Sequence, residues 1–410
     1  MTASQDDARG PSRALLLVTV LLVAANLRPA ITVVGPLIER IGADTGMSAS
    51  ALGLLGALPV LSLGVFSPVV QRLSSRLGME RSILLALGVL AAGTVLRSLP
   101  GGPLPAGVWT LYLGTVILGA AIAVGNVLVP AVVKRDFPDH VPLMTGLYTA
   151  TLVGCAAVAS GVAVPAAAWI GWELTLASAS ALAVVAAVVW SRRGRPQEQA
   201  VVVLPTEVLD SPRPRRRRLT RSPVAWQVTA YFGLQSAVFY IMLTWLPSIQ
   251  TYHGISQAAA GWWLAAYQAV GIIASLLVGP LMQRTRDQRG IAVGLAVLMG
   301  SGVAGMAFVP QLLPVWCLMA GFASGATLLV SLTVVSLRAR TPHQAARLSG
   351  MAQGIGYLLA GSGPLIAGAL VDVTGSWVPV LHVLLGVIAA QGVAGWFAGR
   401  RVFVDDGGGA

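Results

Sequence analysis

One arginine lies near the middle of an apolar stretch that is long enough to cross a bilayer. The stretch runs from about residue 14 to residue 37, and Arg28 stands in it beside Asn26, Pro29 and Thr32. A charged side chain near the bilayer centre costs about 2.5–3.5 kcal/mol on insertion scales, so intramembrane arginines normally serve a function. A guanidinium is always charged and carries a fixed fork of donors, which suits planar carboxylate-like or linear anions.

Two roles are open for Arg28. It can present its charge to an anion or an electron-rich polar group of a solute. Alternatively, it can bind carbonyls that Pro29 frees from helical hydrogen bonding, or polar side chains of neighbouring helices. No carboxylate lies at mid-membrane depth to neutralise it, because the acidic residues fall at the termini, in the breaks or at the ends of apolar runs. We expect the first role, with Arg28 facing a watery cavity.

Further polar residues occur near the middle of other apolar runs. Each could make a hydrogen bond between helices, but together they describe a neutral, hydrogen-bonding pocket around one fixed positive charge. Two of them are four residues apart and share a helix face, Gln353 and Tyr357. The candidate substrate-binding residues are Arg28, Asn26, Thr32, Asn126, Tyr148, Gln235, Tyr240, Gln268, Thr327, Gln353 and Tyr357.

The elements that must position these residues are membrane-spanning helices. Of the 410 residues, 56% are hydrophobic and 10% are charged, whereas charged residues make up about a quarter of a soluble domain. Unbroken apolar runs satisfy their backbone in hydrocarbon as helices, and they lack the alternation of barrel strands. We predict an all-α integral membrane protein with twelve transmembrane helices, at about 14–37, 49–71, 82–99, 107–133, 141–166, 173–191, 224–248, 258–282, 290–309, 313–337, 346–371 and 377–399.

The net charge of +12 is unevenly placed along the chain. If the N-terminus is cytoplasmic, the breaks alternate between two sides, and the inner set holds nearly all Lys and Arg, with Arg28, Arg40 and Arg97 as the exceptions. The positive-inside rule then predicts a protein of the inner (plasma) membrane with both termini in the cytoplasm. The basic run at residues 213–218 lacks interleaved aromatic residues, so we expect it to contact anionic lipid headgroups and not nucleic acid.

An internal repeat divides the chain into two related halves. At a constant offset of 204 residues, Lys134 matches Arg338 and Gly146 matches Gly350. Because each half has six spans, corresponding helices keep the same orientation, as in a parallel repeat that suits alternating access. We predict six-helix bundles at residues 1–191 and 224–410, joined by a basic cytoplasmic linker at 192–223.

The sequence offers little for catalysis at membrane depth. It has no His/Cys/Asp/Glu constellation there and no phosphate-cradling Walker sequence, which argues against an enzyme, a metal or cofactor site and ATP-driven transport. The longest break has about thirty residues, which is short for the output domain of a sensor. We therefore expect a monomer with a small-molecule substrate and no cofactor.

Several stretches resemble one transporter family. The twelve spans in two halves with a basic central loop are similar to the major facilitator superfamily. Within it, the chain resembles the cyanate permease and 2-nitroimidazole transporter family. The stretches that carry this resemblance include Asn26-Leu27-Arg28-Pro29, Lys134-Arg135-Asp136-Phe137-Pro138 and Arg347-Leu348-Ser349-Gly350-Met351-Ala352-Gln353. The resemblance covers about Leu22 to Gly395. One departure is Ser75, at a position where the superfamily usually has an acidic residue of its cytoplasmic gate.

The resemblance implies transport of small, often anionic or weakly polar compounds, with the candidate residues on spans that line a central cavity. We predict a secondary active transporter that moves a small cyanate-like or carboxylate-like anion across the inner membrane by alternating access, with Arg28 at the central site. The alternative is an efflux carrier for drug-like nitroheteroaromatics in which Arg28 is structural. Asp136 and Asp287 are expected to pair with basic residues and help to close the cytoplasmic side.

Overall fold

The computed structural model describes residues 12–99, 106–193, 219–285 and 287–404, which form helices and loops without any strand. This confirms the all-α membrane fold. Short 3-10 helices lie at Pro138–His140, Leu219–Arg221 and Pro310–Leu312. The α-helices are α1 (Arg13–Leu27), α2 (Pro29–Thr32), α3 (Val34–Thr45), α4 (Ala49–Leu77), α5 (Met79–Arg97), α6 (Ala106–Asp136), α7 (Val141–Ser191), α8 (Pro223–Tyr252), α9 (Gln257–Arg284), α10 (Arg289–Phe308), α11 (Leu313–Leu337), α12 (Pro342–Thr374) and α13 (Val378–Ala398).

The long helix α7 accounts for two crossings of the membrane. Eleven segments of the described chain are long and apolar enough to cross a bilayer, and one of them, Leu143–Ser191, has 49 residues. At 1.5 Å per residue it would measure about 70 Å, more than twice the ~30 Å hydrocarbon core. Gly171 has φ 80° and ψ 161° and divides α7 at the break expected between the fifth and sixth spans. The eleven segments therefore make the twelve crossings that the apolar runs predict.

Gly171→Ala is expected to lower the free energy of unfolding by about 1–3 kcal/mol, because its backbone conformation is accessible essentially to glycine alone. Gly154→Ala is the matched control, since Gly154 lies in the same helix and an added Cβ there meets no neighbouring atom. Thermal unfolding of the two variants in detergent measures the difference. Equal unfolding temperatures would mean that α7 does not turn at Gly171.

The first crossing is built from three short helices and not from one continuous helix. α1 ends at Leu27, α2 begins at Pro29, and Arg28 between them has φ −115° and ψ −36°. Pro29 has no N–H for the helical hydrogen-bond ladder, so backbone carbonyls near it are left for other donors. α3 starts at Val34 and extends beyond the apolar run predicted at residues 14–37.

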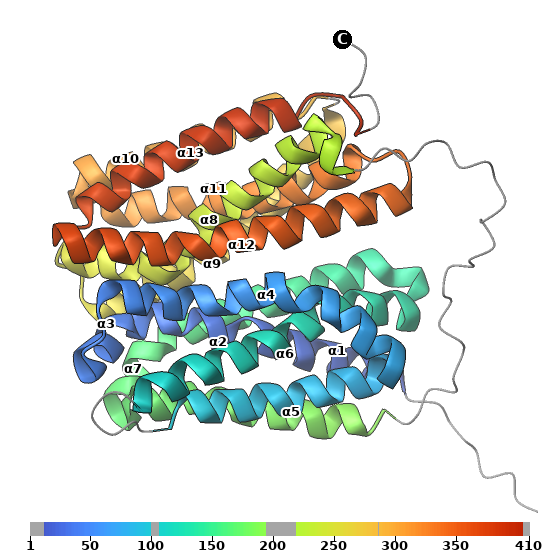
Figure 1. Ribbon diagram of the computed structural model, residues 1–410, viewed down its shortest axis with the longest axis horizontal. Coiled ribbons are helices and arrows are strands. Elements are labelled where there is room, and N and C mark those ends of the chain that lie inside the picture. Colours follow the sequence, from blue (N-terminus) through green and yellow to red (C-terminus); the bar gives the residue numbers. More distant parts are fainter. Residues whose placement is uncertain (1–11, 100–105, 194–218, 286, 405–410) are drawn as a thin grey trace, which may run out of the picture.

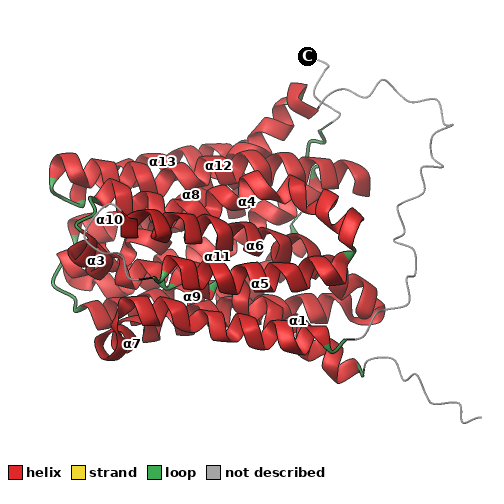
Figure 2. Ribbon diagram, turned by 60° about the horizontal axis from the view of Figure 1, so that its bottom comes forward, coloured by secondary structure: helices red, strands yellow, loops and turns green. Residues whose placement is uncertain are grey.

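The helices are arranged in two groups. Figure 1 shows α1–α7, blue to green, on one side of the molecule, and α8–α13, yellow-green to red, on the other; we call these groups the N half and the C half. Between them, α4 packs along α12, α7 along α9 and α3 against α8. Figure 2 shows the helices running side by side between two ends, where the loops lie. The predicted linker at 192–223 falls largely outside the described residues, so its bounds stay a prediction.

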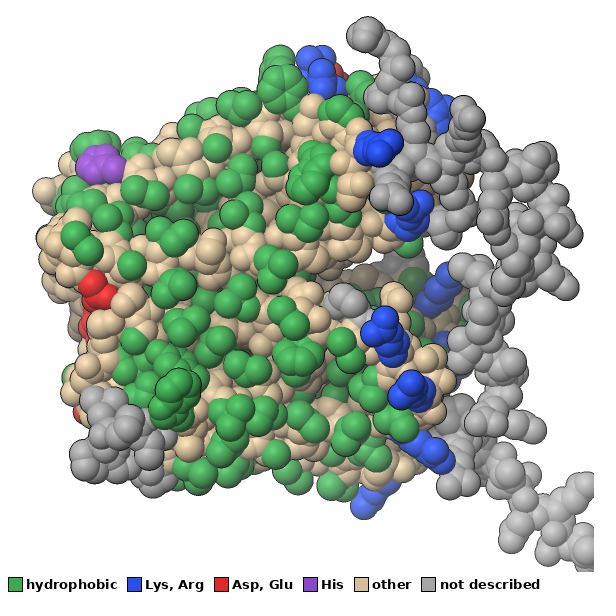
Figure 3. Space-filling view, viewed as in Figure 1, with side chains coloured by type: hydrophobic (Ala, Val, Ile, Leu, Met, Phe, Trp, Pro, Cys, Tyr) green, Lys and Arg blue, Asp and Glu red, His purple; other side chains and the backbone are tan. Residues whose placement is uncertain are grey.

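The two ends of the molecule differ in charge. In Figure 3, the visible Lys and Arg side chains gather at one end, Asp or Glu side chains lie without them at the other, and hydrophobic side chains cover the surface between. The acidic residues of the basic end, such as Glu80 and Asp287, are paired with arginines. The basic end includes Arg72, Arg135, Arg193, Arg289 and Arg338, and the acidic end includes Glu39, Asp44 and Asp372. The apolar belt suits a lipid-facing surface, since large side chains such as Leu276 are 71% exposed.

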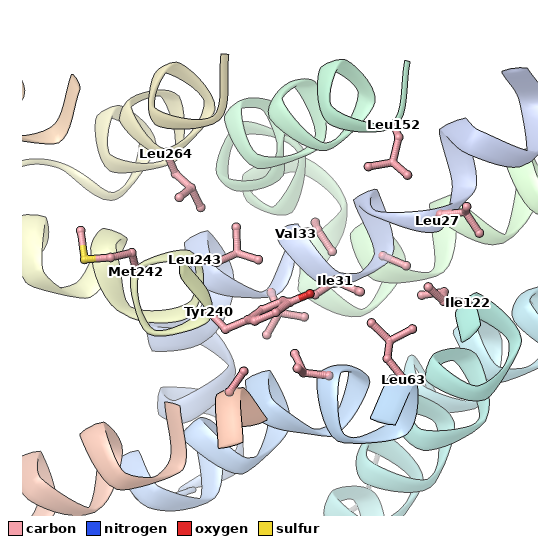
Figure 4. Packing of buried hydrophobic residues seen from close by; sticks show 14 of the residues in the cluster. Leu27, Ile31, Val33, Leu63, Ile122, Leu152, Tyr240, Met242, Leu243 and Leu264 are labelled. Atoms are coloured by element: carbon pink, nitrogen blue, oxygen red, sulfur yellow. The ribbon is translucent and has the colours of Figure 1, made fainter. Parts of the chain in front are cut away.

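Buried side chains of both halves meet at the centre of the molecule. Figure 4 shows Tyr240 of α8 pointing toward Ile31 of α2, with Leu63 of α4 and Ile122 of α6 nearby. Tyr240 is 7% exposed although it carries a polar hydroxyl. The centre of the contact between the halves therefore lies beside the break in the first crossing.

Candidate functional site

Arg28 is held at the break between α1 and α2, on the side of the N half that faces the C half. Its guanidinium carbon lies 5.2 Å from the centroid of the Phe239 ring of α8. Its charge also acts on the hydroxyls of Tyr240 and Tyr357. The side chain is half-buried, and it makes no hydrogen bond or ion pair with any residue that the structure describes. Its donors therefore remain available to a ligand.

A different arginine binds the carbonyl at the break. Arg97, the last residue of α5, donates from Nη1 to the carbonyl oxygen of Ala30 at 2.7 Å and is 1% exposed. Its Nε and Nη2 are buried without a hydrogen-bond partner in the described chain. Arg97 thus binds a carbonyl next to Pro29, whereas Arg28 binds none among the described residues. The sequence did set Arg97 apart, because it is one of the few arginines that lie outside the basic breaks.

One aromatic ring of the C half, Phe239, lies beside the Arg28 guanidinium, and other rings of this half pack in pairs near it. Phe239 and Tyr240 lie edge to face with centroids 5.1 Å apart, and Phe232 and Tyr357 do the same at 5.5 Å. The faces of such rings attract cations, and the tyrosine hydroxyls add hydrogen-bonding groups. The structure therefore brings together three predicted residues, Arg28, Tyr240 and Tyr357, and it adds the apolar ring of Phe239.

Asn26 lies apart from this group. Its side-chain amide donates to the carbonyl of Leu22 at 2.8 Å and to the carbonyl of Leu182 at 3.4 Å, and Asn26 is 4% exposed. Leu182 belongs to the second crossing of α7, so both partners lie in the N half. In this structure Asn26 joins two helices of one half, although it is only two residues from Arg28.

Thr32 and Gln268 belong to a hydrogen-bond chain between the halves. Gln268 of α9 donates to Ser160 Oγ of α7 at 3.0 Å. Ser160 Oγ lies 3.4 Å from the carbonyl oxygen of Thr32, and Thr32 Oγ1 donates to the carbonyl of Ala156 at 3.1 Å. All three polar side chains are buried. Ser160 was not predicted, because one small hydroxyl in an apolar helix gives no signal of its partner.

Three predicted residues find hydrogen-bond partners within their own helices. Gln235 and Gln353 each donate to a serine at 2.7 Å, and Thr327 donates to a backbone carbonyl at 2.6 Å; the partners are Ser236, Ser349 and Ala323. Gln235 and Thr327 are buried, whereas Gln353 is half-buried. Gln353 lies one helical turn from Tyr357, which belongs to the group around Arg28.

Two predicted residues are more open. Asn126 is exposed and lies one turn along α6 from Ile122, which belongs to the same buried cluster as Tyr240. Tyr148 is half-buried in the part of α7 nearest the basic end. Both therefore lie between the centre and the basic end.

The halves are joined by hydrogen bonds at the acidic end. Glu39 of α3 accepts from Thr251 Oγ1 and, at 3.0 Å, from Gln257 Nε2, both of the C half. Asp372 of α12 accepts from the first two backbone N–H groups of α4, at 2.7 and 2.8 Å. A carboxylate at a helix N-terminus is stabilised both by these unpaired donors and by the helix dipole. Neither carboxylate was predicted as a site residue.

At the basic end, the ion pairs lie within one half. Arg135 pairs with Glu80 at 2.5 Å, and Arg193 pairs with Asp136, all in the N half. Figure 3 shows a hollow between the two halves at this end. The conformation is therefore closed at the acidic end and open at the basic end.

Asp287 also pairs within its own half. The hydrogen bond from the Arg289 side chain, at 2.7 Å, lowers the pKa of Asp287 below its ordinary value. Burial lowers the pKa of Arg338, which donates to two carbonyls at the end of α13. In this conformation Asp136 and Asp287 do not join the halves, because the halves are separated here. Their part in closing this end stays a prediction.

The central site offers binding chemistry. It combines one guanidinium, two phenol hydroxyls and the ring of Phe239. Within residues 12–99, 106–193, 219–285 and 287–404, no three His, Cys, Asp or Glu side chains converge as a metal site requires. Cys155 is half-buried, Cys317 is buried, and both are free thiols.

Comparison with known proteins places the chain among transporters. The family model described as Major Facilitator Superfamily matches residues 20–364 and, in a second match, 248–406. A 2-nitroimidazole transporter of Escherichia coli (strain K12) is 38% identical over 394 residues, which cover 95% of this chain and 97% of that protein. The cyanate transport protein CynX of the same organism is 30% identical over 372 residues, 88% of this chain and 91% of that protein. A solved bacterial homologue of the human lysosomal transporter Spinster, inward-facing and occupied, has a TM-score of 0.79 at 14% identity and covers 97% of this chain and 98% of its own.

Proposed function

Because this chain belongs to the major facilitator superfamily, we propose that it is a secondary active transporter of small planar solutes that carry a carboxylate or nitro group. The observation that carries the proposal is the Arg28 guanidinium, which lies between the halves beside Phe239 without a hydrogen-bond or ion-pair partner among the described residues. A charge at membrane depth is costly unless a partner or water meets it. The solute supplies that partner during transport.

Carboxylate and nitro groups present nearly the same shape to Arg28. Each has two acceptor oxygens in one plane, and the guanidinium fork matches such a pair with two parallel N–H···O hydrogen bonds. One site can therefore hold either group, with the ionised carboxylate bound more tightly because its hydrogen bonds are fully charge-assisted. The 38% identical relative named for 2-nitroimidazole supports the nitro group as a recognition element.

The rings around Arg28 favour a flat, aromatic solute. Phe239 covers one side of the guanidinium and leaves its edges for acceptor atoms. Tyr240 and Tyr357 lie within electrostatic reach of the same charge, and their hydroxyls can donate to the solute. Each edge-to-face or offset ring contact adds about 0.5–1.5 kcal/mol beyond area burial. A cyanate-sized anion would use the charge but not the rings.

We assign the basic end to the cytoplasm, as the positive-inside rule requires. The conformation is then inward-open, and both termini are cytoplasmic. An anion that enters a cell against a potential of 100 mV, negative inside, works against about 2.3 kcal/mol per charge. Carboxylate export runs with this field, whereas a neutral nitro compound is unaffected by it.

In the proposed cycle the two halves rock about their central contact. Opening the acidic end breaks the contacts of Glu39 and Asp372 with the opposite half. Closing the basic end brings the clusters around Asp136 and Asp287 together. The Gln268–Ser160 hydrogen bond lies between these two ends, where the halves move least in such a rocking motion.

Transport by purified protein in proteoliposomes tests the proposal. Radiolabelled 2-nitroimidazole, benzoate, cyanate and imidazole are followed in both directions, with protein-free vesicles as the background. We expect movement of 2-nitroimidazole and benzoate well above imidazole, which is flat and aromatic but lacks the two acceptor oxygens. Equal transport rates for imidazole and 2-nitroimidazole would show that the protein does not recognise the nitro group. If only cyanate moved, the substrate would be a small linear anion and not the planar solute proposed above.

A further inference from the structure

A groove on the outer surface lies between α10 and α13, away from Arg28. It has a volume of about 480 Å³, and every residue that lines it is aliphatic or glycine except Trp396. Its floor includes Gly300 and Gly392, whose missing side chains leave the space. Val297 is 62% exposed and Val393 is 59% exposed, so the groove is open along the apolar belt. Its occupant must therefore be apolar and must come from the membrane side.

The groove has the depth of one membrane leaflet. Along α13 its lining runs from Leu385 to Trp396, which at 1.5 Å per residue is about 16 Å. Half of the ~30 Å hydrocarbon core is about 15 Å. The groove therefore extends from the boundary of the basic end to about the midplane, as a single acyl chain does.

The mouth of the groove combines an aromatic ring with positive charge. Trp396 is 47% exposed, and the Arg289 guanidinium carbon lies 4.8 Å from a ring centroid of this tryptophan. Tryptophans favour the level of lipid headgroups. Arg289 pairs with Asp287, and Arg338 binds the carbonyls of Ala398 and Gly399 at the end of α13. Two arginines with one carboxylate leave this end of the groove with a net positive charge. Arg400 lies two residues after the end of α13.

We propose that the groove between α10 and α13 binds one acyl chain of an anionic phospholipid, with the lipid phosphate against Arg289. The wholly apolar lining takes the chain, and its length matches one leaflet. The phosphate gains charge-assisted hydrogen bonds from a guanidinium that already lies at the headgroup level. A zwitterionic lipid can fill the groove, but it gains less from the positive mouth.

Native mass spectrometry of the full chain tests this, with phosphatidylglycerol and phosphatidylcholine of identical acyl chains added at equal concentration. We expect wild type to retain phosphatidylglycerol about fivefold more tightly, the effect of one arginine near the headgroups. Arg289→Gln should remove this preference, whereas Arg284→Gln, an exposed arginine at the same end on α9, should keep it.

A second pair of variants tests the groove itself. In Gly300→Leu the new Cβ would lie 3.6 Å from Ile388, an ordinary contact distance, and the rest of the side chain would fill the groove. We expect this variant to retain neither lipid. Gly88→Leu is the control, because Gly88 is exposed and an added Cβ there meets no neighbour. Gly300→Ala should give a partial loss if the leucine variant does not fold.

Three results would overturn the proposal. The first is equal retention of phosphatidylglycerol by Gly300→Leu and Gly88→Leu. The second is no preference between the two lipids in wild type. The third is a dimer that Gly300→Leu dissociates, which would assign the groove to a second copy of the chain.

Discussion

Arg28→Gln is expected to weaken the binding of 2-nitroimidazole and benzoate by about 10- to 100-fold. A hydrogen bond to a charged group contributes about 1.5–3 kcal/mol, and every 1.4 kcal/mol is a factor of ten in affinity. Gln keeps a polar side chain of moderate length but loses the charge and the fork. The loss should be larger for benzoate, because its full negative charge interacts with the guanidinium more strongly than a nitro group does. Isothermal titration of the detergent-solubilised protein measures both affinities.

Arg28→Lys separates charge from shape. It keeps the positive charge but cannot bind two coplanar oxygens in the fork geometry, so we expect an intermediate loss of roughly tenfold. Arg40→Gln is the matched control, because it removes an arginine from the same crossing near the acidic end. It should leave both affinities unchanged. If a correctly folded Arg28→Gln protein bound both solutes with wild-type affinity, Arg28 would have only a structural role.

Asp372→Asn is expected to shift the protein toward the conformation that is open at the acidic end. The Asp372 carboxylate accepts from two backbone N–H groups of α4 across the interface between the halves. An amide can accept only through its single oxygen, and it loses the attraction of a negative charge to a helix N-terminus. Since hydrogen bonds to charged groups contribute about 1.5–3 kcal/mol, we expect the ratio of the two conformations to change by at least tenfold.

Spin-label distances across the acidic end measure this shift. Labels on single cysteines in the α4 and α12 ends should show a new, longer distance in Asp372→Asn, after the free Cys155 and Cys317 have been replaced. Asp44→Asn is the matched control: its carboxylate binds Trp172 Nε1 at 2.8 Å at the same end, but both residues belong to the N half. A distance distribution that is unchanged in Asp372→Asn, or changed equally in both variants, would show that Asp372 does not hold the halves together.

Most crossings could be predicted from the sequence, and some to within a residue or two, although the first crossing extends to Thr45 and α4 extends to Leu77. The run predicted at 313–337 is α11, Leu313–Leu337, and the run at 377–399 is α13, Val378–Ala398. The physical reason is that hydrocarbon allows no unpaired backbone and requires about 20 apolar residues for each crossing. The same reasoning missed the continuation of α7 through the predicted break before residue 173, because one glycine with positive φ turns the chain without any polar loop.

The direction of each site side chain could not be predicted from the sequence. Asn26 and Arg28 are two residues apart, yet Asn26 binds a carbonyl within the N half and Arg28 lies against Phe239 of the C half. In a transmembrane helix nearly every neighbour is apolar, so an isolated polar residue does not reveal which side faces lipid, a second helix or the cavity. For the same reason neither Ser160 nor the ring of Phe239 was predicted as part of the site.

The sequence by itself determined the number of crossings, the two-half repeat, the uneven placement of charge and the presence of one arginine without a carboxylate at its depth. These features follow from the apolar solvent of the bilayer and from the length needed to cross it, and both constraints act on each segment separately. Only the tertiary structure decided that Arg97 binds the Ala30 carbonyl, and that Glu39 and Asp372 join the halves at the acidic end. Such contacts depend on how helices rotate and pack against partners that are distant in sequence, and no local pattern of residues encodes that choice.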